Sequence, residues 1–326
     1  MMALLLAATH ASAGDRDPLF IDCVSTCASP IACAGWSEEN FGPALMGWSC
    51  LADCHYLCMM KITAARQNAL PKLSVLQYHG KWPFVRLLCM QEPASVLFSL
   101  ANDITHAIGL NCCWPLAASV EGGWAWRVLG ILSVNAWTWA SVFHCRDVYW
   151  TQCADYFSAT LLVGFGALVA TQQVLMELGG SGSRLHTRVM PPLTLMASAA
   201  FAEYVRRMLR HFDFGQNVRI SVTLGALQMS LWVLWWLLCR RERPHAWKAP
   251  AVSILSAALL LTFELGDFPP LLGILDSHAI WHFSTVPAAA VFWHGLVAPE
   301  LRWRLAVHGQ PAPQTRRSSS HLKRKP

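Results

Sequence analysis

The sequence predicts an all-α membrane protein, in which a seven-transmembrane helix bundle follows a small, disulfide-rich helical region in the lumen. Of its 326 residues, 54% are hydrophobic and 13% are charged, whereas soluble globular proteins carry roughly 25% charged residues. The mean hydropathy is +0.35. Six of the twelve cysteines lie between Cys23 and Cys58. This composition makes ordinary soluble enzymes poor candidates and indicates repeated membrane spans.

Residues 1–13 are expected to form a signal peptide. A short apolar stretch is followed by Ala11-Ser12-Ala13, which has the small-x-small form of a signal peptidase site with cleavage before Gly14. The apolar stretch is too short to span a membrane. Secretion would place the chain from Gly14 onward in an oxidising compartment.

Residues 14–90 are expected to form a lumenal cysteine-rich region. Two segments with Cys-x3-Cys spacing place their thiols on one face of a helix, and a further cysteine lies between them. The pattern predicts two helices joined by three disulfides, because a region of this size has too thin a core to be stable alone. Six thiols allow 15 pairings, and the sequence does not choose among them. A zinc cluster is the competing interpretation, although CxxxC spacing is less typical of structural zinc than CxxC. The candidate cysteines are Cys23, Cys27, Cys33, Cys50, Cys54 and Cys58.

Residues 91–300 are expected to form the transmembrane bundle. If the cysteine region is lumenal, the cytosolic segments of the chain hold 14 Lys and Arg residues and the lumenal loops hold 5. Because basic residues favour the cytosolic side, this bias supports a lumenal N-terminus and a cytosolic C-terminus. Apolar character predicts the seven spans at 93–113, 124–145, 154–177, 190–206, 217–239, 250–266 and 275–298.

The tail, residues 301–326, is rich in Ser, Pro, Arg and Lys and is expected to be cytosolic, basic and disordered. The sequence contains no visible Gly-rich phosphate loop and no nucleic-acid-binding motif, so no nucleic-acid partner is expected. The partners that this organisation favours are membrane lipids.

Ionisable residues gather at the lumenal ends of three predicted spans. Titratable groups inside a membrane are costly, so their positions are informative. The second span ends at His144 and is followed by Asp147, while the third begins near Asp155. The seventh begins with Asp276, His278 and His282.

These residue types favour a catalytic zinc site. His278 and His282 are four residues apart, on one helical face, and His144 supplies a third nitrogen. Three protein ligands with an open fourth position are typical of a zinc ion that activates water against an ester or amide carbonyl. Asp155 is the candidate general base.

Other interpretations of this region remain open. Asp147 and Asp276 are expected to orient the imidazoles from behind. Paired histidines at a membrane interface are also often simple polar anchors. Cys145 and Cys153 flank the short loop beside the site, and their positions favour a disulfide.

Several longer motifs resemble those of a known family. These motifs cover most of the chain from Gly14 to about Trp293, and they resemble the post-GPI-attachment-to-proteins factor 3 family, where GPI is glycosylphosphatidylinositol. That family belongs to the CREST superfamily of seven-span hydrolases, which also holds alkaline ceramidases. The matching stretches are Gly14-Asp15-Arg16-Asp17-Pro18, the six-cysteine pattern, Tyr78-His79-Gly80-Lys81-Trp82-Pro83-Phe84, Gln91-Glu92-Pro93-Ala94-Ser95, Asn135-Ala136-Trp137, Val142-Phe143-His144-x-Arg146-Asp147, Asp155-Tyr156, Asp267-Phe268-Pro269-Pro270 and Asp276-x-His278-Ala279-Ile280-Trp281-His282-x-Ser284-Thr285.

The resemblance implies GPI-anchor lipid remodelling in the Golgi or the endoplasmic reticulum. The implied reaction is phospholipase A2-type hydrolysis of the sn-2 acyl ester of the phosphatidylinositol in GPI-anchored proteins, which would be the partners and substrates. It also implies zinc ligands at His144, His278 and His282 and an acidic catalytic residue at Asp155. The superfamily usually has a serine four residues before the first of these histidines, where this chain has Ala140. Ser141 is adjacent, about 100° further around the helix, so its catalytic role is in doubt.

Three rival functions remain. A ceramidase-type lipid amidase would use the same metal chemistry on an amide. A seven-helix receptor or cargo-binding protein with a structural metal would bind without turnover. A folding or trafficking factor would act through the cysteine-rich region alone.

Overall fold

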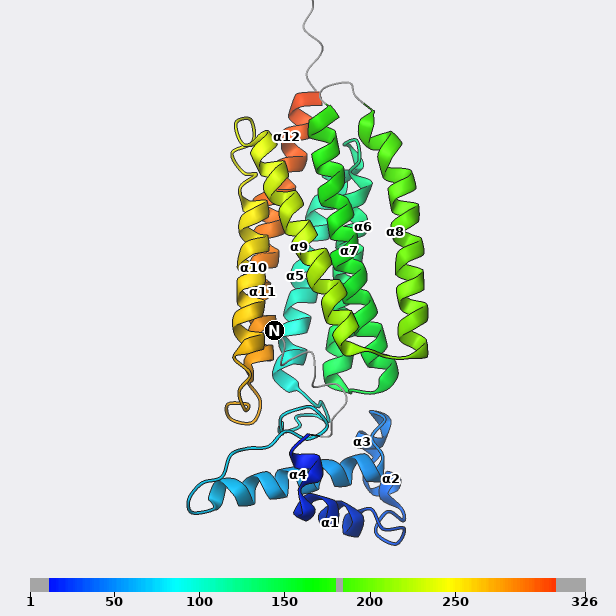
Figure 1. Ribbon diagram of the computed structural model, residues 1–326, viewed down its shortest axis with the longest axis vertical. Coiled ribbons are helices and arrows are strands. Elements are labelled where there is room, and N and C mark those ends of the chain that lie inside the picture. Colours follow the sequence, from blue (N-terminus) through cyan, green and yellow to red (C-terminus); the bar gives the residue numbers. More distant parts are fainter. Residues whose placement is uncertain (1–11, 180–183, 309–326) are drawn as a thin grey trace, which may run out of the picture.

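The computed structural model describes residues 12–179 and 184–308. Residues 1–11 of the predicted signal peptide and residues 309–326 of the predicted tail lie outside the described residues. The described chain is all-helical and forms only isolated β-bridges besides its helices. Figure 1 shows long helices that run along the molecule, with the N-terminal region at one end and α4 (Cys50–Asn68) lying across that end.

The N-terminal region is built on two helices and three disulfides, as predicted. Two of the disulfides join the helices to each other, and the third ties the segment between them to the second helix. Asp17 caps α1 (Pro18–Cys27) by accepting a hydrogen bond from the Leu19 amide, and Ser49 caps α4 in the same way. The short helices η2 (Gly14–Arg16), α2 (Trp36–Glu39) and α3 (Phe41–Leu45) complete the region. The disulfides are Cys23–Cys58, Cys27–Cys54 and Cys33–Cys50. All six thiols are therefore bonded in pairs, and the competing zinc cluster is wrong.

The bundle consists of long helical segments. Each predicted apolar range lies inside one of them or matches it to within two residues. The segments are α5 (Pro93–Ala118), α6 (Trp124–Cys145), α7 (Tyr149–Gly179), α8 (Leu185–Arg210), α9 (Phe214–Cys239), α10 (Lys248–Leu265) and α11 (Ser277–Ala290), the last continuing through the π-helix η3 (Val291–Val297) into α12 (Ala298–His308).

Three of these helices, α6, α7 and α9, are long and apolar enough to cross a membrane. The other segments differ for local reasons. Helix α8 carries charged side chains such as Arg188 and Glu203, and α11 gives way to the π-helix after 14 residues. The described residues therefore support a membrane protein, and the full count of seven spans remains a prediction.

Tryptophan packing holds the bundle helices in register. Trp126, Trp232, Trp235 and Trp293 are all nearly or fully buried in one core cluster. A Cβ atom added to Gly109 of α5 would lie 2.2 Å from Cγ of Trp293, so only glycine lets the indole approach the helix backbone this closely. This contact fixes α5 against the C-terminal helical segment, and those two elements supply parts of the candidate site.

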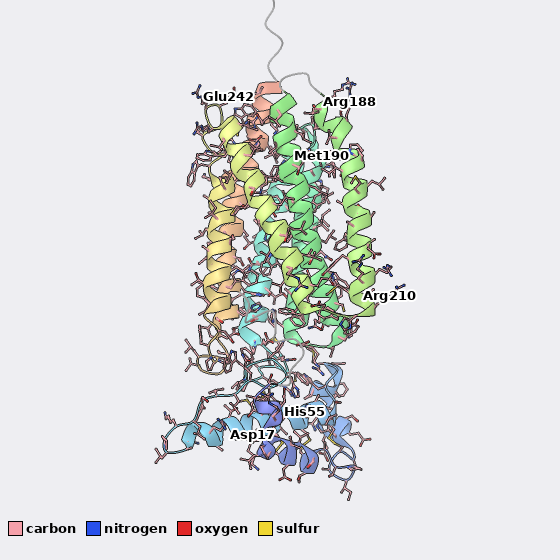
Figure 2. The ribbon with its side chains drawn as sticks, in the orientation of Figure 1. Asp17, His55, Arg188, Met190, Arg210 and Glu242 are labelled. Atoms are coloured by element: carbon pink, nitrogen blue, oxygen red, sulfur yellow. A yellow bond between two sulfur atoms is a disulfide. The ribbon has the colours of Figure 1, made fainter. Side chains whose placement is uncertain are left out.

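The N-terminal region contacts the bundle at the end where α6 finishes and α7 begins. The amides of Gln91 and Glu92 donate to the carbonyls of Cys145 and His144, each at 3.0 Å. The Val85 amide donates to the Gly273 carbonyl at 2.7 Å. In the side-chain view, Arg210 marks this end of α8, while Arg188 and Glu242 lie at the opposite end (Figure 2).

The predicted disulfide between Cys145 and Cys153 is wrong, because both are free thiols. Cys153 lies one turn into α7 and is buried in the bundle, whereas Cys145 ends α6 and is partly exposed. The two residues therefore face different surroundings even though a short connection separates them.

Candidate metal centre

Three histidines lie together at the bundle end that contacts the N-terminal region. His144 comes from the last turn of α6, and His278 and His282 come from the first turns of α11. One nitrogen from each ring can be chosen so that all three lie within 4.8 Å of one another. The Nε2 atoms of His278 and His282 are 3.0 Å apart. The structure thus brings three imidazoles from two helices to one point.

A carboxylate holds the ring of His144 from behind. Oε2 of Glu92 lies 2.7 Å from Nδ1 of His144. Glu92 directly precedes Pro93, the first residue of α5, and is 5% exposed. Because its own amide also donates to the His144 carbonyl, both the backbone and the side chain of Glu92 fix the end of α6.

Lys81 balances the charge of this buried carboxylate. Its Nζ lies 2.5 Å from Glu92 and 2.8 Å from Asp147. Burial would lower the pKa of Lys81, but the carboxylates of Glu92 and Asp147 raise it above its ordinary value. Burial would likewise raise the pKa of Glu92, but Lys81 and His144 hold that pKa well below its usual range. Glu92 is therefore a carboxylate beside His144.

A hydroxyl holds the ring of His282 in a similar way. Oγ of Ser99 on α5 lies 2.8 Å from Nδ1 of His282, and Ser99 is fully buried. Asn102, one turn further along α5, donates to the His282 carbonyl at 2.8 Å and accepts from Thr285 at 3.1 Å. Helix α5 therefore fixes both the backbone and the ring of His282.

The residues present fit a zinc ion. Nδ1 is engaged by Glu92 in His144 and by Ser99 in His282, which leaves Nε2 of each ring for another partner. Zinc-binding histidines usually carry such a partner on the nitrogen that does not bind the metal, because it fixes the tautomer and the orientation of the ring. Three histidine nitrogens are also a common donor set for catalytic zinc.

The other predicted site residues lie near this cluster in different roles. Asp155, on α7, is partly buried and interacts electrostatically with His278. Asp276 caps α11 by accepting from the Ala279 amide at 2.8 Å, and Asp147 pairs with Lys81. Ser141 donates to the Trp137 carbonyl of its own helix at 2.9 Å. The structure thus places Asp155 near His278 and gives Ser141 a partner within α6.

Two residues that hold imidazoles, Glu92 and Ser99, were not among the predicted site residues. The sequence does contain a signal for Glu92, which is a glutamate placed directly before a proline at the start of an apolar helix. Ser99 gives no such signal, because serine is common on helix surfaces packed inside membranes. Ser99 contacts His282 because α5 and α11 pack against each other at this point, and the sequence does not indicate that packing.

The chain is similar to known proteins along nearly its whole length. The model of the Per1-like family matches residues 41–298. The chain is 33% identical over 311 residues to the zebrafish (Danio rerio) protein named GPI-specific phospholipase A2-like PGAP3, covering 91% of this chain and 93% of the relative. The human protein of the same name is 34% identical over 307 residues, covering 90% and 91%. The Schizosaccharomyces pombe Protein PER1 homolog is 34% identical over 286 residues, covering 85% and 84%. No solved structure matches the chain.

Proposed function

This chain belongs to the Per1-like family, and we propose that it is a membrane hydrolase that removes the sn-2 fatty acid from the phosphatidylinositol of GPI-anchored proteins. The printed name of its zebrafish and human relatives, GPI-specific phospholipase A2-like, supports this substrate class. The observation that carries the proposal is the cluster of His144, His278 and His282, whose rings are held from behind by Glu92 and Ser99.

The proposed setting is the membrane of the Golgi or the endoplasmic reticulum, with residues 14–90 in the lumen and residues 91–300 forming seven spans. The long helices of the bundle support this count, although, among the described residues, only α6, α7 and α9 are individually long and apolar enough to be identified as spans. The excess of Lys and Arg in the segments predicted to be cytosolic supports the orientation. The histidine cluster would then face the lumenal leaflet.

In this proposal, His144, His278 and His282 hold a zinc ion. A zinc ion at such a site acts as a Lewis acid that polarises an ester carbonyl and lowers the pKa of water. The protein's own contribution is to fix the three rings. Glu92 and Ser99 prevent the rings of His144 and His282 from turning, and Lys81 keeps Glu92 ionised.

Asp155 is the proposed general base. Water attacks the sn-2 carbonyl carbon while a carboxylate oxygen of Asp155 takes one of the water protons. The bond between the carbonyl carbon and the glycerol oxygen then breaks, and Asp155 returns the proton to that oxygen. The products are a free fatty acid and a lysophospholipid that still carries the GPI headgroup.

The test is fatty-acid release from a purified GPI lipid by the full-length protein in detergent. His278→Ala is expected to reduce release to the background level, because one of the three proposed ligands is gone. His294→Ala is the matched control, since His294 lies in η3 on the same continuous helical segment and is exposed. Normal release by His278→Ala would overturn the site assignment.

The same assay separates the rival functions. Release of fatty acid from ceramide and not from a GPI lipid would favour a lipid amidase. Binding of the GPI lipid without any release would favour a receptor or cargo-binding protein with a structural metal. Function that needs only the cysteine-rich region would favour a folding or trafficking factor.

A further inference from the structure

A cavity of about 400 Å³ lies between the N-terminal region and the end of the bundle. Helix α4 contributes Tyr56 and Met59 to its wall, and the segment that follows contributes Lys81 and Arg86. The connection between α6 and α7 contributes Arg146 and Asp147, two and three residues after His144. The volume is in the range of pockets that hold small ligands, roughly 300–1,000 Å³. The three clustered histidines do not line this cavity, but its wall includes Arg146 and Asp147, which follow His144 closely in the chain.

Of the three Lys and Arg side chains named in this wall, Arg146 is the one that forms no ion pair within 4.0 Å of a carboxylate among the described residues. Lys81 is paired with Glu92 and Asp147, and Arg86 pairs with Asp53 at 2.8 Å. Arg146 donates only to backbone carbonyls, at 3.0 Å to its neighbour Asp147 and at 3.4 Å to Gly47.

The Nε atom of Arg146 is buried and has no hydrogen-bond partner within the part of the chain that the structure describes. A buried donor without a partner is costly, and a guanidinium group is suited to bind phosphate through two parallel N–H groups. Arg146 therefore has both the charge and the unused donor capacity to bind an anionic group.

Aromatic side chains hold this guanidinium and line the rest of the cavity. Cζ of Arg146 lies 3.8 Å from the centre of a Trp48 ring, and Cζ of Arg86 lies 3.3 Å from it. Trp82 and Tyr149 add further ring surface. The negative π face of an aromatic ring attracts C–H groups, and Tyr and Trp also carry a polar O–H or N–H group, which suits a ligand with both C–H and hydroxyl groups such as a sugar or an inositol. Stacking on Trp48 also fixes the position of Arg146 before any ligand binds.

We propose that this cavity binds the polar headgroup of the lipid substrate, with the phosphodiester on Arg146 and the attached inositol against the aromatic wall. The inference rests on the proposed function, since it names the site that would hold the headgroup while the sn-2 ester lies at the histidines. The two sites are joined through the chain itself, because Arg146 follows His144 by two residues. They are also joined through Lys81, which contacts both Glu92 behind His144 and Asp147 in the cavity wall.

The test is binding of glycerophosphoinositol, the deacylated headgroup, to the purified full-length protein by titration calorimetry. Arg146→Gln is expected to weaken this binding about 10- to 100-fold, because a charge-assisted contact to phosphate is lost. Arg146→Lys keeps the charge but not the paired N–H groups and is expected to weaken binding several-fold. Arg127→Gln is the matched control, since Arg127 also lies over a tryptophan, Trp114, at the other end of α6, and it should leave binding unchanged.

Two comparison ligands identify what is recognised. Inorganic phosphate and myo-inositol are each expected to bind far more weakly than glycerophosphoinositol. Equal binding of phosphate alone would overturn the headgroup site, because it would show only an anion-binding arginine. Unchanged binding by Arg146→Gln would also overturn it. If that variant does not fold, Arg146→Lys decides the question.

The binding assay is independent of hydrolysis, so the two proposals fail separately. If the wild-type protein binds glycerophosphoinositol through Arg146 but releases no fatty acid, the proposed function fails and the headgroup site stands. If it releases fatty acid but binds no glycerophosphoinositol, the headgroup site fails and the proposed function stands. In the hydrolysis assay itself, Arg146→Gln is expected to raise KM for the GPI lipid more than it lowers kcat.

Discussion

The two ends of the bundle both bury charged groups and histidines, but they use them differently. At the end near the N-terminal region, three imidazoles lie close to one another, and Glu92 holds one of them from behind. At the opposite end, where Figure 1 shows α12, the fully buried Glu300 of that helix lies among cations from several segments. Its carboxylate contacts Arg304 at 2.7 Å, His245 at 3.0 Å and Arg243 at 3.4 Å.

The difference lies in what each imidazole faces. Nε2 of His245 is directed at a carboxylate, so that ring is satisfied by the protein itself. Glu177 and Gln173 take further contacts from Arg243 and Arg304, and the cluster ties the connection after α9 to α7 and α12. At the other end, Nε2 of His282 faces the Nε2 atom of His278. Burial of charge is therefore common to both ends, and the feature that distinguishes the candidate metal centre is a pair of imidazoles that face each other.

The largest expected effect tests this contrast directly with one histidine from each end. His282→Ala is expected to abolish fatty-acid release and bound zinc, because a proposed ligand is lost. His245→Ala should retain zinc and most of the activity per folded molecule. Elemental analysis of the purified proteins and the lipid assay measure both outcomes. Zinc retained at the wild-type level in His282→Ala would remove the basis for calling the first end a metal centre.

The next effect concerns stability at the opposite end. Glu300→Ala leaves Arg304, His245 and Arg243 without their shared carboxylate, and removing one partner of a buried ion pair typically costs about 3–5 kcal/mol. The free energy of unfolding in mixed micelles should fall by that amount, while the activity per folded molecule should remain near the wild-type value. A loss of activity without a loss of stability would contradict the structural role of this cluster.

A smaller effect is expected at the carboxylate behind His144. Glu92→Gln keeps the shape of the side chain but removes its charge, and such changes behind a metal ligand typically cost about 10- to 100-fold in metal affinity or activity. Zinc titration and the lipid assay report the two quantities. Glu177→Gln is the matched control, because Glu177 pairs with Arg243 at the opposite end, and it should not change zinc affinity.

Much of the fold could be predicted from the sequence because the signals are local. Apolar runs predicted helices close to those observed, and the spacing of six cysteines predicted two helices joined by disulfides. Helix α8 begins at Leu185, earlier than the predicted 190, because the helix continues through Pro191 and Pro192. The pairing of the cysteines depends on how α1 lies against α4, which the spacing alone does not determine.

The candidate site could be predicted only in part, because it too depends on how helices pack against one another. The positions of His144, His278 and His282 follow from the ends of the predicted spans. The partners behind two of these rings are Glu92, directly before α5, and Ser99 within it, and their identity depends on how α5 meets α6 and α11. Asp147 and Asp276 looked like suitable partners by position, yet one pairs with Lys81 and the other caps α11. A carboxylate that lies near a histidine in the sequence is therefore a poor guide to which side chain contacts the imidazole, because that contact depends on how the helices cross.

The smallest expected effects come from two serines that a sequence reader would treat alike. Oγ of Ser99 contacts Nδ1 of His282, whereas Oγ of Ser141 donates to the carbonyl of Trp137 within α6. Ser99→Ala should lower activity about 10-fold, the lower limit for a partner behind a metal ligand, and zinc affinity should fall with it. Ser141→Ala should change activity less than about twofold, because a serine bonded to its own helix contributes little. A large loss in Ser141→Ala would mean that its hydroxyl leaves the Trp137 carbonyl and reaches the substrate during the reaction. The two variants thus distinguish a hydroxyl that orients an imidazole from a hydroxyl that only forms a hydrogen bond within its own helix.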